Sequence, residues 1–407
     1  MIFKNITIGT TTSTTSNGVE IEGMCEDILF YECNIQTHTN ATNSIYAGVR
    51  YDSKSGSFTH MKNVRFIKNN VDGGYSNFYF RYPAGGQGGM KDGAMLVTID
   101  SNHLTNAYHS GIHSYYYARY NSISYNTIIS RNSDFVTSTW YGMYLNYYNN
   151  VDDIIGNKIK STNTSIGFPR GIYMHYYFNY TSYSGSGSGL VANNEIILRT
   201  AGTTDGLYIN MPYSNPQLVH NSVYMYGTES CRALYLYNNS TSYKPIIKNN
   251  NLVTAAGATA SPIYYNGSYY NTSYFEVDYN NYYSTGDNVG YAANMAQITL
   301  EDLRRVTMQD VNSVNKAPVY IDYPSSLFVY GYDLACPLLN SVQTNVQTDI
   351  NNITRTSTTV MGAYQFVPSY ANDVQPYALV TPSSVVMRGQ KEIVSIEIIN
   401  LGTDTLT

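Results

Sequence analysis

Charged side chains are scarce in this chain of 407 residues. Lysine, arginine, aspartate and glutamate together make up 13% of it, and the formal net charge is −5. A protein that binds nucleic acid along its surface needs clustered lysine and arginine to neutralise phosphates. Because the sequence has no basic excess of this kind, its composition argues against nucleic acid as the main partner.

Long hydrophobic runs are also missing. No stretch of about 18 apolar residues that would cross a membrane occurs, and residues 2–8 read as a strand rather than as a secretory signal. Since the open end of a repeat protein needs a cap, we expect that the chain is truncated before Met1.

Cysteine and tryptophan are rare as well. Because Cys25, Cys33, Cys231 and Cys336 show no CxxC spacing, the sequence predicts neither a metal site nor a disulfide framework from them. We expect free cysteines that fill small apolar positions. Tyrosine, by contrast, is abundant, with 44 tyrosines against 12 phenylalanines and one tryptophan.

A repeat of about 30 residues runs through most of the chain. Most units begin with glycine or alanine and continue with alternating apolar residues, as in Gly111-Ile112 and Gly142-Met143. Nine such strand starts occur, at Gly18, Gly48, Asn77, Gly111, Gly142, Gly171, Gly206, Ala233 and Pro262. A period in this range is typical of solenoids, in which each coil buries its apolar face against the next.

A second position of the repeat is asparagine in eight units out of nine. Its residues are Cys33, Asn69, Asn102, Asn126, Asn157, Asn194, Asn221, Asn250 and Asn280. An asparagine amide both donates and accepts, so identical side chains one strand spacing apart can hydrogen-bond along the solenoid. Asparagine also tolerates the left-handed backbone that a tight turn needs. The flanking segments, such as residues 123–128, are short, β-branched and alternating, which favours strands over helices.

These patterns predict an all-β protein whose main part is a right-handed parallel β-helix of about nine or more coils. We assign residues 1–298 to this solenoid. Residues 299–370 form a predicted closing segment that begins with a short helix at 299–306, capped by Thr299. Residues 371–407 change to longer alternating strands and predict a partial β-sandwich fragment, too small to be stable alone.

Several motifs resemble those of known proteins. The repeated Gly-Ile-x-Leu and Asn-x-Ile units are similar to the pectate-lyase-like β-helix superfamily. Residues 300–366, ending in Gly-Ala-Tyr-Gln-Phe at 362–366, look like the closing region of β-helix proteins secreted by Bacteroidetes, with Gln365 in place of an acid. The tail resembles the start of a CARDB-type immunoglobulin-like module, whose Asn-x-Gly-Thr turn matches residues 400–403. The resemblance implies the fold, while the superfamily contains lyases, hydrolases, esterases, epimerases and noncatalytic adhesins.

One face of the predicted strands carries the candidate binding residues. Counted from each strand start, the second and fourth residues point outward. The predicted substrate-binding residues at these positions are Tyr79, Tyr115, Tyr144, Tyr173, His175, Tyr208, Tyr235 and Tyr264. Coils rise by about 4.8 Å, which is comparable to one sugar, so we expect a polysaccharide whose rings stack on the tyrosines. Stacked aromatics also stabilise neighbouring strands whatever their function.

The first coils carry charged residues on the same face. A lyase that acts on a uronic acid needs a base and a group that neutralises the substrate carboxylate. Arg81 or His113 is our candidate base, and Glu22 with Asp52 are candidate ligands for Ca²⁺. A hydrolase would instead use two carboxylates, for which Glu22 and Asp52 are again the candidates. The alternative is a ladder of surface ion pairs, Glu20 with Arg50 and Asp52 with Arg81.

Taken together, the residues and the resemblance predict a protein that is secreted or held at the cell surface and that engages a polysaccharide along this face. We expect a monomer. Three function classes stay open. A lyase or glycoside hydrolase would use the charged residues, a binding module would use the tyrosines alone, and an adhesin or structural stalk would use neither. Beyond the candidate Ca²⁺, the sequence points to no cofactor.

Overall fold

The computed structural model describes residues 1–9, 15–52, 61–81, 97–116, 118–132, 139–147, 149–175, 189–210, 214–321, 323–331, 333–338, 346–367, 374–381, 393–400 and 402. Within these residues the regular elements are β-strands and one short α-helix. No helix among them is long and apolar enough to cross a membrane.

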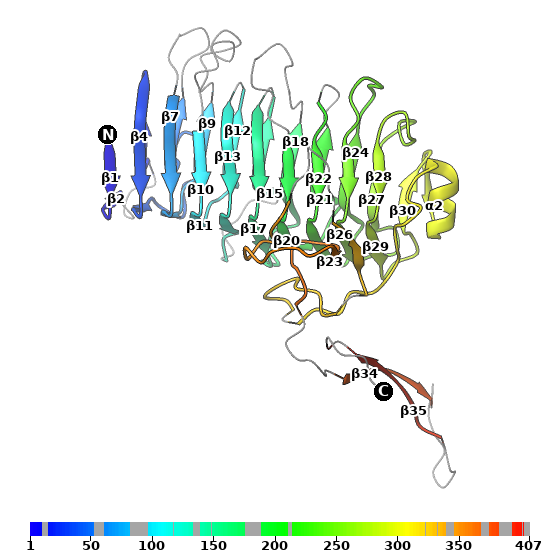
Figure 1. The fold of residues 1–407 in the computed structure, drawn as a ribbon. Helices are drawn as coiled ribbons and strands as arrows, with labels where there is room; N and C mark the ends of the chain where they lie inside the picture. The colour runs from blue at the N-terminus through cyan, green and yellow to red at the C-terminus, as the bar shows by residue number, and fades with distance from the viewer. Residues whose placement is uncertain are drawn as a thin grey trace.

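Three sheets form the sides of a solenoid, and the chain visits them in turn (Figure 1). Sheet A consists of β1 (Ile2–Lys4), β4 (Cys25–Tyr31), β7 (Met61–Ile67), β10 (Val97–Asp100), β13 (Arg119–Ser124), β16 (Asn150–Ile155), β19 (Leu190–Ala192), β22 (Gln217–Val219), β25 (Ile246–Lys248) and β28 (Glu276–Asp278). Sheet B consists of β2 (Thr7–Gly9), β5 (Asn34–Gln36), β8 (Asn70–Asp72), β11 (His103–Thr105), β14 (Thr127–Ile129), β17 (Lys158–Ser161), β20 (Glu195–Thr200), β23 (Ser222–Gly227), β26 (Asn251–Ala255) and β29 (Asn281–Ser284). Sheet C consists of β3 (Val19–Ile21), β6 (Val49–Asp52), β9 (Ser76–Arg81), β12 (Ser110–Tyr115), β15 (Thr139–Asn146), β18 (Phe168–His175), β21 (Thr204–Asn210), β24 (Cys231–Tyr237), β27 (Ser261–Tyr265), β30 (Gly290–Ala292) and β31 (Met295–Gln297).

The predicted parallel β-solenoid is confirmed. All nine strand starts lie in, or directly before, successive strands of sheet C, and the nine positions of the asparagine repeat lie in the turns between sheets A and B. The strands of the three sheets pair in parallel, except that β31 is antiparallel to β30. The repeat of the sequence is therefore one coil of the solenoid.

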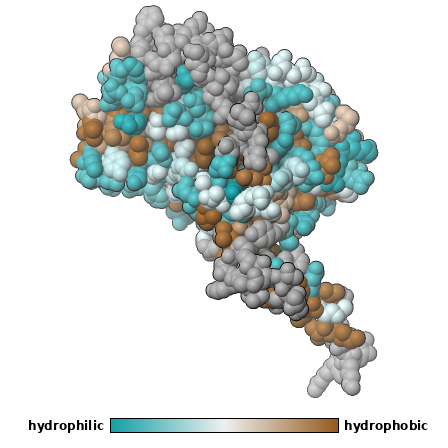
Figure 2. All heavy atoms as spheres, viewed as in Figure 1, coloured by the Kyte–Doolittle hydropathy of each residue, from teal (hydrophilic) through white to brown (hydrophobic). Residues whose placement is uncertain are grey.

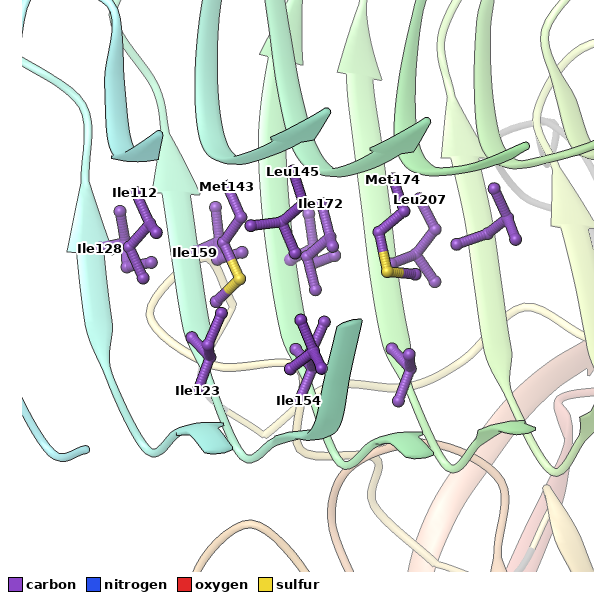
Figure 3. Close-up of a cluster of buried hydrophobic side chains, with 14 of the residues drawn as sticks. Ile112, Ile123, Ile128, Met143, Leu145, Ile154, Ile159, Ile172, Met174 and Leu207 are labelled. Carbon is purple, nitrogen blue, oxygen red and sulfur yellow. The ribbon is translucent and has the colours of Figure 1, made fainter. Parts of the chain in front are cut away.

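A column of apolar side chains fills the interior. Figure 3 shows Ile112 and Met143 of sheet C meeting Ile128 and Ile159 of sheet B, with Ile123 of sheet A below them. Each of these side chains is at most 1% exposed. Burial of one such side chain stabilises a fold by about 1.5–3 kcal/mol, so the stacked coils hold each other through this column.

The glycine at the strand start faces the core, and this interrupts the alternation of the strand. A Cβ at Gly142 would lie 2.5 Å from Cγ2 of Ile159, and one at Gly171 would lie 2.3 Å from the backbone oxygen of Gly206. The next residue, Met143, is also buried. Two successive residues thus point inward, so the residue before the glycine faces outward together with the second residue after it.

Eight asparagines form a continuous ladder between sheets A and B. The Asn69 side-chain amide donates to Oδ1 of Asn102 at 2.9 Å, and the Asn69 backbone N–H donates to the same oxygen at 2.9 Å. This pattern repeats from coil to coil as far as Asn280, whose backbone N–H donates to Ser313 Oγ at 3.0 Å. The predicted hydrogen-bonded stack is confirmed, and Ser313 ends it.

The sequence predicts the left-handed backbone at the ladder asparagine, but the structure places it at the residue before. Positive φ values occur at Lys68 (56°), Ser101 (58°) and Tyr125 (56°), each directly ahead of a ladder asparagine. The asparagine is required for its side chain, because its amide satisfies backbone groups of two adjacent coils.

The four cysteines are free, as predicted. Cys33 occupies the first position of the asparagine repeat, where its backbone N–H donates to Oδ1 of Asn69 at 3.0 Å.

The helix expected after the solenoid is α2 (Leu300–Thr307), and Thr299 caps it by accepting from the backbone N–H of Asp302 at 3.1 Å. Its Leu303 is buried against the last coil. Beyond α2 the chain turns back across the outer side of sheet B, and we call the described residues between 314 and 366 the strap (Figure 1). The strap contains the short strands β32 (Ala335–Pro337) and β33 (Thr358–Val360).

Glu195 of β20 fixes the strap at one point. Its Oε2 accepts from the backbone N–H of Leu327 at 2.6 Å and from the Tyr364 hydroxyl at 2.8 Å. Arg355 of the strap donates to Asn193 Oδ1 at 2.7 Å. Residues more than 130 positions apart in sequence are thereby joined.

A small antiparallel sheet follows at the C-terminal end, formed by β34 (Val374–Thr381) and β35 (Ser395–Asn400). Several apolar side chains of this ribbon are exposed, among them Val380, Ile396 and Ile398. Figure 2 shows hydrophobic surface at this end of the molecule. This two-stranded sheet agrees with the small β-fragment that the sequence predicts for residues 371–407. The domain boundaries at 298 and 370 stay predictions.

Candidate functional site

The outward face of sheet C gathers the residues that the sequence singled out. The strand register places the second-position residues opposite one another from coil to coil, in the order Glu20, Arg50, Tyr79, His113, Tyr144, Tyr173, Tyr208, Tyr235, Tyr264 and Tyr291. The predicted alignment of these side chains is therefore confirmed, and their roles stay predictions. Tyr291 extends the row by one coil that the repeat count did not include.

Six tyrosines of this row form one uninterrupted stack, from Tyr144 to Tyr291. The ring centroids of Tyr173 and Tyr208 are 4.3 Å apart and those of Tyr208 and Tyr235 are 4.4 Å apart, with interplanar angles of 17° and 7°. Across all five steps the centroids are 4.3–5.5 Å apart and the angles stay at or below 21°.

The stacking determines which atoms a ligand can reach. Both faces of each inner ring are covered by the neighbouring rings, so the edges and the hydroxyl groups are what remains for contact. The expected stacking of sugar rings on tyrosine faces does not fit this geometry. What the row offers instead is a line of hydroxyl groups, each able to donate and accept a hydrogen bond.

A second outward row runs beside the tyrosines, at the position directly before each strand start. It contains Tyr141, Arg170, Asp205 and Arg232 on successive strands. The Arg232 guanidinium lies 4.7 Å from the ring centroid of Tyr235 and 4.9 Å from that of Tyr264, and its Nε donates to Asp205 Oδ1 at 2.6 Å. Asp205 is 1% exposed, and burial raises the pKa of its carboxyl group.

Sequence reasoning missed this second row. A strict alternation assigns the residue before the glycine to the core, and only the two successive inward residues at the slot turn it outward. The usable signal was the polar character of Arg170, Asp205 and Arg232 at one fixed position of the repeat.

His113 is enclosed by aromatic rings. Its ring centroid lies 4.8 Å from that of Tyr79, 4.9 Å from that of Tyr144 and 5.4 Å from that of His109. Burial, with His109 as a smaller contribution, lowers the pKa of His113 well below its ordinary value, and burial lowers the pKa of His109 to about 4. Both imidazoles are therefore neutral at pH 7.

The charged residues of the first coils pair with one another. Arg50 reaches Asp52 Oδ2 at 2.7 Å and also pairs with Glu20, and Arg81 Nε lies 3.5 Å from Asp52 Oδ1. This is the ion-pair ladder that the sequence offered as an alternative. Both oxygens of Asp52 thus face arginines, while Glu22 lies exposed just after β3.

No group of three or more histidine, cysteine, aspartate or glutamate side chains suited to a metal ion occurs among the residues that the structure describes. The Ca²⁺ role of Glu22 and Asp52 and the catalytic roles of Arg81, His113, Glu22 and Asp52 stay predictions.

The fourth-position residues make a short polar chain beside the stack. Asn146 donates to the Tyr144 hydroxyl at 2.6 Å, and its Oδ1 lies 2.9 Å from Nδ1 of His175. Burial lowers the pKa of His175. Tyr115 packs edge-on against Tyr116, with centroids 4.2 Å apart. These side chains widen the polar strip along sheet C.

No family model, curated protein or solved structure matches this chain. The likeness to pectate-lyase-like proteins therefore rests on the sequence motifs alone, and the fold rests on the structure.

Proposed function

We propose that this protein binds an extended polysaccharide along the outward face of sheet C and does not cleave it. The observation that carries the proposal is the stack of six tyrosines from Tyr144 to Tyr291, which repeats one hydroxyl-bearing edge every 4.3–5.5 Å. A polysaccharide also repeats its hydroxyl groups along one axis, so many weak hydrogen bonds can form in register.

Binding without cleavage fits the chemistry of the charged end of sheet C. A general base works best when its pKa lies near the working pH, and burial moves the pKa of His113 far below it. A pair of hydrolytic carboxylates needs two acids facing one bond, but both oxygens of Asp52 are occupied by Arg50 and Arg81.

The proposal also places the protein outside the cell and relates it to the pectate-lyase-like β-helix proteins that Bacteroidetes secrete. Its support is the closing motif at 362–366, in which the Ala363 N–H donates to Ser222 Oγ at 2.9 Å and Tyr364 reaches Glu195. We assign the β34–β35 ribbon to a CARDB-type immunoglobulin-like module that acts as spacer or anchor, because its turn sequence at 400–403 resembles that family.

The test is affinity electrophoresis of the full chain through gels that contain one polysaccharide each. We expect at least one glycan to retard the wild type. Tyr208→Phe keeps the ring stack and removes one hydroxyl, so it should weaken retardation, and Tyr208→Ala should weaken it further. Tyr283→Phe on sheet B is the matched control and should behave as wild type. Unchanged retardation of both Tyr208 variants, or no retardation by any glycan, would contradict the proposal.

A second candidate, a lyase at the charged end, is favoured by one observation: Arg81, on the strand next to His113, is partly exposed and carries its charge beside Tyr79. Incubation of the glycan panel with Ca²⁺ tests it, followed by the ultraviolet absorbance of unsaturated uronides and by reducing-sugar release. Product that forms with the wild type and is lost in Arg81→Ala would establish catalysis and overturn the noncatalytic proposal.

A further inference from the structure

Arg170 differs from the other arginines of sheet C in its surroundings. Arg50 and Arg81 pair with Asp52, and Arg232 pairs with Asp205. Within the described residues, no hydrogen bond or ion pair includes the guanidinium of Arg170. Its charge lies instead 5.2 Å from the ring centroid of Tyr173 and 5.7 Å from that of Tyr141.

The neighbouring carboxylate, Asp205, is shared between Arg170 and Arg232. The register that sets Ile172 opposite Leu207 puts Arg170 level with Asp205, which is buried and bonded through Oδ1 to Arg232 at 2.6 Å. The single negative charge of Asp205 therefore lies between two cations, and one positive charge on this part of the strip is left over.

The position of Arg170 suits a ligand that runs along the stack. Its side chain is half-buried against Tyr141 and Tyr173, which limits its freedom before anything binds. A guanidinium held in this way presents N–H donors in a plane that matches the two oxygens of a carboxylate or a sulfate. The tyrosine hydroxyls on either side contact the neutral part of the same chain.

We propose that Arg170 forms a subsite for an anionic substituent, a carboxylate or a sulfate ester, on the polysaccharide bound along sheet C. This inference rests on the proposed function. It predicts a preference for charged over neutral glycans, which the tyrosine stack alone does not provide, and it predicts that added salt weakens the preference.

The experiment compares matched polymers of two backbones: hydroxyethyl cellulose, carboxymethyl cellulose and cellulose sulfate, and dextran, carboxymethyl dextran and dextran sulfate. Dissociation constants of the full chain are measured by biolayer interferometry at 20 and 200 mM NaCl. We expect at least one charged derivative to bind about tenfold more tightly than its neutral parent at low salt. The carboxymethyl and sulfate arms show which anion the subsite takes.

Arg170→Gln should lose this preference and retain the affinity for the neutral polymer. Arg305→Gln, on the exposed side of α2, is the matched control and should keep the preference. Thermal melting of Arg170→Gln checks that the solenoid is intact. Equal binding of neutral and charged polymers by the wild type, or a full preference in Arg170→Gln, overturns the subsite and leaves the proposed function standing. No binding of any of the six polymers counts against both.

Discussion

At the scale of single residues, the ladder asparagines show how one side chain can hold two coils. In each of them except the last, Asn280, the amide nitrogen donates to the next asparagine and to a backbone carbonyl of the preceding coil, as Asn69 does to Phe30 O at 3.1 Å. The amide oxygen accepts from the coil before. Aspartate lacks the donors and serine lacks the reach, so asparagine is the residue that satisfies all these groups.

Asn69 and Asn70 form a natural pair for testing the ladder, because they are adjacent and only Asn69 belongs to it. Asn69 is 1% exposed, and Asn70 is exposed. Asn69→Ala leaves the N–H of Cys33 and the carbonyl of Phe30 without these partners, so we expect it to lower the free energy of unfolding by about 3 kcal/mol. Asn70→Ala should change it by no more than about 0.5 kcal/mol. Urea unfolding measures both, and equal losses would argue against the ladder as a source of stability.

Asp310 accepts a hydrogen bond from Ser313, the residue that ends the ladder, and gives this end of the solenoid a pH dependence. It is fully buried, its Oδ1 accepts from Ser313 Oγ at 2.6 Å and from the Tyr282 hydroxyl at 2.8 Å, and burial raises its pKa to about 6. The folded state thus holds the proton more tightly than the unfolded state, whose value is near 3.8. The contribution of this group to the free energy of unfolding is complete below pH 4 and is lost as the pH rises through 6. The total loss is about 3 kcal/mol.

Asp310→Asn keeps the shape of the neutral acid and cannot ionise. We therefore expect the variant to gain stability relative to the wild type between pH 4 and pH 7. Urea unfolding of both proteins at these two pH values gives the difference, in which the titration of other groups cancels. A difference that does not change with pH would show that Asp310 keeps the same protonation in both states.

At the scale of the strand, the sequence pattern decides which way a side chain points but not how its ring is oriented. The register of sheet C and the outward row of tyrosines followed directly from the spacing of the glycine slots. The face-to-face stacking of Tyr173 and Tyr208, which closes their faces to a ligand, depends on rotamers that no repeat encodes. The outward position of Arg170 was missed for a related reason, since the glycine slot breaks the alternation.

The glycine slot itself can be tested by adding one methyl group. A Cβ at Gly171 meets backbone oxygen at 2.3 Å, whereas one at Gly290 meets the side-chain ends of Ile263 and Leu303 at 3.1–3.3 Å. Gly171→Ala must displace the adjacent coil, so we expect a loss of about 1–3 kcal/mol. Gly290→Ala should lose less, because flexible side chains can move. Thermal unfolding ranks the two variants, and the opposite order would contradict the steric explanation.

At the scale of the whole molecule, the repeating part of the structure could be predicted from sequence and the strap could not. The strand starts, the outward row of sheet C and the asparagine ladder all repeat, so each unit of sequence supports the others. The strap makes single contacts, such as Leu327 and Tyr364 to Glu195, across sequence separations of 132 and 169 residues. Contacts that occur once leave no periodic signal, and the buried Glu195 looks like any exposed acid in the sequence.

Glu195 should therefore control whether the strap stays on sheet B. It is 3% exposed and accepts from two strap donors, so Glu195→Ala leaves both without that partner and opens a buried space. The solenoid core does not depend on this residue. We expect the strap to detach before the solenoid unfolds, with faster cleavage within residues 314–366 during limited proteolysis and little change in the main thermal transition.

Glu276→Ala is the control, because that side chain is more than half exposed and pairs with Lys248 at the surface of β25 and β28. Its cleavage rate should match the wild type. Strap cleavage that is equally slow in Glu195→Ala would show that Arg355, through Asn193, and the apolar contacts of Leu327 and Tyr364 hold the strap without the carboxylate. A lowered main transition would instead make the strap part of one cooperative unit with the coils that it crosses.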